Sequence, residues 1–271
     1  MVENENYISV ISVLEVLSTG DDPIKVLAED ENAYVIKHNI RGMMLKNMAR
    51  EWISYQLFRH FSVSVPKAEL LVFDPMMFRE ELGSLTGRFN KHIVFGSRWL
   101  NARDVKDDMY EGKTKTSENL KNPEELARIL VMDLWLKNSD RQPYNLNMIV
   151  ANQKLYAIDH AATFDQISFI DLAKPVLKEY FVQPGEIGEL IVSSHFFRYY
   201  YNRFAQKLEE AGRNLCREIE ATDKPLINRI LRTLPEGWCI TEDEKNAVID
   251  YLIFRKAILS NLFIEHLNFS R

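Results

Sequence analysis

Short apolar runs dominate about the first hundred positions of the chain, and polar turns separate them. Runs of this kind, rich in Val, Ile, Leu and aromatic side chains, are typical of β-strands. Residues 43–61 differ, because their apolar positions recur at spacings of three and four, as in an amphipathic helix. The pattern therefore predicts a β-rich region with one helix. We expect its strands at residues 7–17, 24–27, 33–36, 69–73 and 92–99.

From about residue 102 the hydrophobic spacing becomes mostly that of helices. Pro123 suits the first turn of a helix, where an N–H is not needed, and Thr241 with Glu244 has the spacing of a capping box. We expect helices at residues 123–136, 185–193, 196–211, 224–234 and 241–267. The chain is therefore predicted to be an α+β protein of two lobes. Residues 1–97 form the small β-rich lobe and residues 98–271 the larger helical lobe, joined near residues 95–100.

The segment at residues 136–164, LKNSDRQPYNLNMIVANQKLYAIDHAATF, carries the clearest chemical signal. Asp140 is followed five positions later by Asn145, and a predicted hairpin then ends at Asp159. Kinase-like phosphotransferases need one carboxylate at the attacking hydroxyl, and an amide and a second carboxylate that hold magnesium on the phosphates of ATP. We therefore predict Asp140 as the catalytic residue, with Asn145 and Asp159 as metal ligands. The alternative is a polar turn, which does not explain why an apolar strand ends on an Asp.

Two further polar residues lie in the same segment. Arg141 directly follows Asp140 and is a candidate catalytic residue, with two roles open: to pair with a phosphate or to brace the loop. Asn147 has two roles open, a second polar contact of the site or an outward-facing strand residue, and we expect the second.

The β-rich lobe offers candidate residues for nucleotide binding. Lys37 ends a predicted strand, where its ammonium can neutralise phosphates, and Glu51 lies on the following helix, where an orienting carboxylate is needed. Each taken alone is better explained as a solvated surface charge, but their order before Asp140, Asn145 and Asp159 favours function. Ser18, Thr19 and Gly20 lie between the first two strands, where backbone N–H groups can cradle phosphate. An ordinary hairpin turn explains those three residues equally well.

Taken in order, the lysine strand, the glutamate helix, D-R-x-x-x-N and I-D-H resemble the HipA-like kinases, relatives of the protein-kinase and phosphatidylinositol-kinase folds. The segments FRHFSVSVPKAELLVF, VFGSRWL and LPEGWCITEDEKNAVIDYL are similar to a compact bacterial HipA-like kinase domain, and the resemblance covers about residues 13–259. It implies a bilobal, protein-kinase-like fold and magnesium-dependent transfer from ATP to Ser or Thr. It also implies that Lys37 is the ATP lysine, with Glu51 as its partner. Finally, it places Phe95 and Ser97 near a hinge whose backbone binds adenine.

Composition and the absence of apolar spans limit the partners and the location that we expect. The formal net charge of −5 gives no support for binding nucleic acid through a general basic face. Cys216 and Cys239 have no metal-site spacing and are expected to be reduced thiols. The first residues lack the basic start and apolar run of a signal peptide, and no stretch is long enough for a membrane span. We therefore expect a cytoplasmic protein that does not contact the membrane.

Three other functions remain open from the sequence. A small-molecule kinase shares the ATP site, and Glu179, Glu186 and Glu189 are candidates for an acidic acceptor pocket. A pseudokinase scaffold binds nucleotide and a partner protein without turnover. The third alternative is a helical module that only binds other proteins. In that case the kinase-like motif at residues 136–164 is accidental.

Overall fold

The computed structural model describes residues 7–17, 23–37, 44–88, 92–105, 120–143, 145–174 and 191–270. Strands dominate the N-terminal part of the chain and helices the C-terminal part, as predicted. None of the described helices is long and apolar enough to span a membrane. The chain divides into two compact units, described separately below. Unit 1 is Met1–Trp52, Pro66–Leu100 and Leu234–Cys239, and unit 2 is Ile53–Val65, Asn101–Thr233 and Ile240–Arg271.

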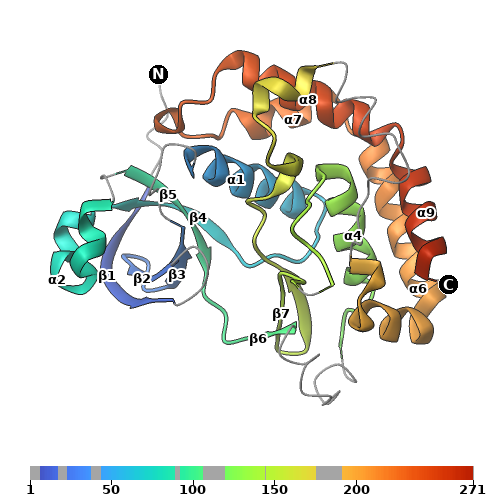
Figure 1. The fold of residues 1–271 in the computed structure, drawn as a ribbon, viewed down its shortest axis with the longest axis horizontal. Coiled ribbons are helices and arrows are strands. Elements are labelled where there is room, and N and C mark those ends of the chain that lie inside the picture. The colour runs from blue at the N-terminus through green and yellow to red at the C-terminus, as the bar shows by residue number, and fades with distance from the viewer. Residues whose placement is uncertain are drawn as a thin grey trace. The chain divides into compact units, whose positions relative to one another are not determined.

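Unit 1 contains a closed barrel of five strands (Figure 1). Around the barrel the order is β1-β2-β3-β5-β4, and only the β1–β4 pair is parallel. Closure leaves no open edge in this sheet, so each strand has a partner on both sides. The strands are β1 (Ile8–Val16), β2 (Ile24–Ala28), β3 (Ala33–Ile36), β4 (Ala68–Phe73) and β5 (His92–Arg98).

The interior of the barrel is closely packed. Alternate residues of β2 are buried, as expected for a strand with one face in a core. Gly96 on β5 leaves no room for a side chain, because a Cβ there would lie 2.5 Å from Cδ1 of Leu71. Trp238 comes from a distant part of the chain, in the short 3₁₀ helix η7 (Glu236–Trp238), and its indole N–H donates to the carbonyl of Ile93 at 2.8 Å.

The predicted helix of this region is α1 (Met44–His60), and three short helices that the sequence did not indicate also occur. They are η1 (Pro75–Phe78), α2 (Arg79–Leu82) and η2 (Gly83–Arg88). Asp74 begins this group, since its side chain accepts the N–H of Met76. The prediction of a single helix was wrong because segments of four to six residues are too short to show a helical period.

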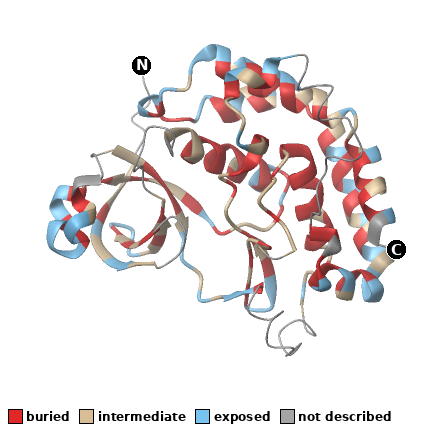
Figure 2. Ribbon diagram, viewed as in Figure 1, coloured by how far each residue is buried: buried red, intermediate tan, exposed pale blue. Residues whose placement is uncertain are grey.

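The core of unit 2 is built around α4 (Glu125–Leu136), in which eleven of twelve residues are buried (Figure 2). Helices α6 (His195–Glu220), α8 (Glu242–Lys256) and α9 (Leu259–Ser270) pack against it, and α7 (Lys224–Leu231) packs against α8. A helix that is apolar on all sides has to be surrounded by other elements. The apolar sequence of α4 therefore makes it the central helix of this unit.

One helix prediction for this unit needs correction, and another is mostly untested. The expected helix at residues 241–267 is two helices, because α8 ends at Lys256 and α9 begins at Leu259. Neither Gly nor Pro marks this break, so packing decides it. The capping box of Thr241 and Glu244 is confirmed. The helix predicted at residues 185–193 lies mostly outside the described residues, which show only the 3₁₀ helix η6 (Ile191–Ser193) at its end.

A small sheet in unit 2 carries the segment of interest. Its strands are β6 (Arg103–Asp104), β7 (Met148–Ala151) and β8 (Lys154–Ala157), in sequence order and antiparallel. The predicted hairpin is therefore present. It turns through Asn152 and Gln153, both in the left-handed region. The polar loop lies between α4 and β7, and Asp159 follows β8.

Candidate active site

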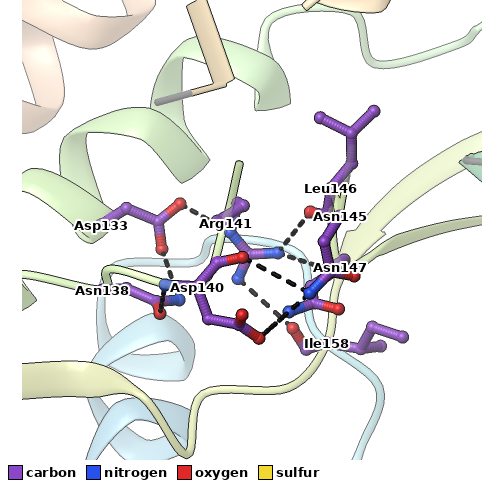
Figure 3. Close-up of polar contacts among 8 residues, drawn as sticks. All are labelled: Asp133, Asn138, Asp140, Arg141, Asn145, Leu146, Asn147 and Ile158. Atoms are coloured by element: carbon purple, nitrogen blue, oxygen red, sulfur yellow. Dashed lines mark hydrogen bonds and ion pairs between the residues drawn. The ribbon is translucent and has the colours of Figure 1, made fainter. Parts of the chain in front are cut away.

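A buried carboxylate holds the loop to the end of α4 (Figure 3). Asp133 lies in the last turn of this helix; its Oδ1 accepts from Nδ2 of Asn138 at 3.1 Å and its Oδ2 from Nε of Arg141 at 2.6 Å. Lys137 ends the helix in the left-handed conformation, with φ of 51°. The N–H groups of Lys137 and Asn138 both donate to the backbone carbonyl of Asp133. One helical residue thus fixes two points of the loop.

The buried side chain of Arg141 braces the loop. Its side chain is 0% exposed, and the ion pair with Asp133 is equally buried. The guanidinium also donates to the carbonyls of Leu146, Asn147 and Ile158, which holds together the residues just before β7 and the residue just after β8. A planar group with several fixed donors suits this task. Because its donors are turned inward, the geometry supports only the bracing role of the two predicted for Arg141.

Burial and the neighbouring charges shift the pKa of the Asp133 carboxyl in opposite directions. Removal from water raises the pKa of the Asp133 carboxyl, while the guanidinium of Arg141, His160 and the amide of Asn138 oppose that rise. The charged form of Asp133 therefore depends on these neighbours. Arg141 is the largest of the opposing influences.

Asp140 is held inside the loop by side-chain amides. Its backbone N–H donates to Oδ1 of Asn138 at 3.4 Å, and its Oδ2 accepts from Nδ2 of Asn145 at 3.1 Å and from Nδ2 of Asn147 at 2.8 Å. Asn145 exchanges two backbone hydrogen bonds of 3.0 Å with Gln142, which closes the turn. The structure thus brings together Asp140 and Asn145, as the motif predicted.

The prediction for Asn147 was wrong. It does not face outward from a strand, because β7 begins one residue later, at Met148. Its φ of 44° is left-handed, a conformation that Asn tolerates better than most residues. This conformation accompanies a side chain that donates to Asp140.

Asp159 directly follows Ile158, whose backbone makes two hydrogen bonds to the loop. The N–H of Ile158 donates to the carbonyl of Asn147 at 2.9 Å, and the carbonyl of Ile158 accepts from Arg141. Asp159 itself is half-buried and has φ of 57°. Among the described residues no group of three or more His, Cys, Asp or Glu side chains is placed to hold a metal. A magnesium ion nevertheless needs only one or two protein oxygens when phosphates supply others.

The donor chemistry of Asn145 and Asp159 fits such an ion. The amide nitrogen of Asn145 is engaged with Asp140, which leaves its carbonyl oxygen for a ligand. Asp159 adds a carboxylate. Both are hard oxygen donors, as magnesium prefers.

In unit 1, Lys37 and Glu51 form the predicted pair. Nζ of Lys37 lies 2.7 Å from Oε1 of Glu51, with side-chain exposures of 23% and 3%. Lys37 directly follows β3, and Glu51 is buried on α1. The carboxylate of Glu51 is buried, whereas the ammonium of Lys37 is still partly open to solvent. This arrangement can orient the ammonium toward a second anion.

Phe95 and Ser97, the residues predicted near an adenine-binding hinge, both lie on β5. Phe95 is a core residue, buried and packed edge-on to Trp52 with ring centroids 6.5 Å apart. Ser97 pairs with Val35 on one side and Ala68 on the other. Pairing on both edges engages the backbone N–H and C=O groups of Ser97 in the sheet, so the structure gives no support for an adenine contact there. The backbone of Phe95 pairs with Leu70 of β4, and its place at a hinge stays a prediction.

Ser18, Thr19 and Gly20 lie outside the described residues, as do Glu179, Glu186 and Glu189.

Sequence reasoning missed Asp133 and Asn138, which position the loop. Asp133 did leave a signal, since it is the only charge in the apolar run ILVMDLWL. A charge in a helix buried on all sides requires a partner. Arg141, eight residues later, is that partner.

A mixed fold with strands before helices, a Lys–Glu ion pair, and a loop that carries Asp and Asn before a hairpin is typical of kinase-like phosphotransferases. A family model described as HipA-like kinase matches residues 10–176, more than half of the chain. The chain belongs to the HipA-like kinase family.

The similar solved structures include a crystal structure of the proinflammatory kinase CtkA from Helicobacter pylori. It is 12% identical, with a TM-score of 0.56, over 96% of this chain and 99% of that one. At this identity the likeness concerns the fold alone. No curated protein matches the chain.

Proposed function

We propose that the protein is an ATP- and magnesium-dependent phosphotransferase that modifies serine or threonine hydroxyls of a protein acceptor. The observation that carries this proposal is the loop around Asp140. A carboxylate held by two side-chain amides lies on a loop anchored to the central helix, one residue from the Arg141 brace. Membership of a kinase family supports phosphoryl transfer as the chemistry of this loop.

In the proposed step, Asp140 aligns the acceptor hydroxyl and takes its proton. The acceptor oxygen forms a bond to the γ-phosphorus, and the bond from that phosphorus to the bridging oxygen breaks. The electron pair of the broken bond leaves with ADP. Catalysis then consists mainly of positioning and of neutralising charge, which the rigid support of the loop favours.

Asn145 and Asp159 would hold magnesium through their side-chain oxygens, where the ion neutralises phosphate charge. Lys37, oriented by Glu51, would bind the α- and β-phosphates. Asn145 and Asp159 belong to unit 2, and the Lys37–Glu51 pair to unit 1.

The direct test is incubation with γ-labelled ATP and magnesium, with and without lysate of the source cell. We expect label in protein with the wild type, and loss of that label with EDTA, which removes the ion, or with Asp159→Asn, which takes away the charge of a proposed ligand and weakens magnesium binding. Asp171→Asn is the matched control, since Asp171 lies twelve residues later in an exposed ion pair with Lys174. Label that stays in ATP under every condition would contradict the proposal. Label found only in metabolites would point to a small-molecule kinase.

A second prediction concerns ATP affinity. Lys37→Met is expected to weaken ATP binding by about ten- to a hundredfold, because a hydrogen bond to a charged group is worth about 1.5–3 kcal/mol. Calorimetric titration with a non-hydrolysable ATP analogue measures this change. Lys67→Met is the control: Lys67 pairs with Glu69 in the same unit at 2.8 Å, but it is 54% exposed. Equal affinities for the two variants would rule out Lys37 as a phosphate ligand.

A further inference from the structure

The two carboxylate oxygens of Asp140 have different surroundings (Figure 3). Oδ2 accepts from both Asn145 and Asn147, whereas no described residue donates to Oδ1. An oxygen with two donors has little capacity left for a third. The oxygen that remains for an acceptor hydroxyl is therefore Oδ1.

Of the two donors to Oδ2, Asn147 makes the shorter bond, at 2.8 Å against 3.1 Å for Asn145. Asn145 has a second proposed task, as a metal ligand. Asn147 has no such task, and its backbone is fixed from two sides, because its carbonyl accepts from the buried guanidinium of Arg141 and from the N–H of Ile158. Asn147 therefore presents its amide from a rigid position.

The backbone of Asn147 limits which residue can stand there. At φ of 44°, Asn, Asp and Gly are tolerated, and most other residues are strained. Asp would place a second carboxylate against Asp140, and Gly would supply no donor. Asn alone of these three can donate to Oδ2.

We propose that Asn147 is a positioning residue for phosphoryl transfer. It holds Oδ2 of Asp140 so that Oδ1 faces the acceptor hydroxyl and takes its proton. This inference rests on the proposed function, because it assigns an orientation to the carboxylate that function requires. Asn147 itself touches neither ATP nor acceptor.

Asn147→Gly tests the inference, because glycine keeps the left-handed backbone and removes only the side chain. We expect kcat to fall by about ten- to a hundredfold, since a misplacement of about 1 Å can cost a hundredfold. The KM for ATP and the thermal midpoint should stay near the wild-type values. Asn152→Gly is the matched control, at φ of 51° in the exposed turn of the neighbouring hairpin, and should leave kcat unchanged.

A second variant separates positioning from packing. Asn147→Asp has nearly the same shape and the same tolerance of this backbone, but it replaces a donor with a negative charge. We expect kcat to fall at least as far as with Asn147→Gly. Activity retained in Asn147→Asp would overturn the inference, because shape alone would then suffice.

A crystal structure of Asn147→Gly makes the test independent of activity. If the wild type transfers no phosphate, the proposed function fails, and the structure still decides whether Asn147 orients Asp140. We expect the carboxylate of Asp140 to rotate or to become disordered in the variant. An unchanged carboxylate would overturn the role of Asn147, whatever the wild type does with ATP.

Discussion

Replacing Asp140 by alanine is expected to lower the rate of phosphoryl transfer by about 10²–10⁴-fold, the range for loss of a positioned acid–base group. ATP binding should change little, because the proposed ATP ligands are Lys37 and, through the metal, Asn145 and Asp159. The quantities to measure are kcat with labelled ATP and the dissociation constant of a non-hydrolysable analogue. A loss of kcat with unchanged affinity is the expected pattern.

Asp140→Asn is the companion variant. Its carbonyl oxygen can still accept from Asn147, so the loop keeps its shape, but the side chain no longer accepts a proton from the acceptor. We expect Asp140→Asn to be nearly as inactive as Asp140→Ala. Wild-type transfer in either variant would remove Asp140 from the mechanism, and with it the reason for the orientation assigned to Asn147.

The order of segments along the chain, rather than either residue alone, predicted the Lys37–Glu51 pair. A strand that ends in Lys and a helix that carries Glu are both defined by hydrophobic spacing, and the structure joins the two side chains at 2.7 Å. The D-R-x-x-x-N spacing likewise brings Asp140 and Asn145 together, because both belong to one short loop. Both contacts join residues whose helix, strand or loop can be located from the hydrophobic spacing of the sequence.

Asn147 and the break between α8 and α9 could not be predicted in this way. The left-handed backbone of Asn147 occurs with contacts to Arg141 and Ile158, and neither feature leaves a periodic signal in the sequence. The apolar spacing of residues 241–267 continues across the break, so only the packing of the folded unit ends one helix there. The backbone pairing of Ser97 on both edges likewise requires knowledge of the barrel's closure.

The largest effect on stability is expected from Asp133→Ala, which should lower the free energy of unfolding by about 3–5 kcal/mol. Removing one partner of a buried ion pair leaves the other charge buried and uncompensated, and that penalty sets the magnitude. Here the remaining charge is Arg141, whose side chain is 0% exposed. Asp133→Asn should lose less, because an amide oxygen can still accept from the guanidinium. Urea unfolding measures all three proteins.

Asp250→Ala is the control that isolates burial. Asp250 and Lys224 are 2.7 Å apart, nearly the same distance as Asp133 and Arg141, but their side chains are 51% and 61% exposed. An exposed pair contributes about 0–1 kcal/mol, because water solvates each charge when the other is removed. A similar loss of stability in Asp133→Ala and Asp250→Ala would mean that Arg141 does not depend on Asp133. A much larger loss in Asp133→Ala would mean that the charge pair at the end of α4 stabilises both the helical core and the loop that carries Asp140.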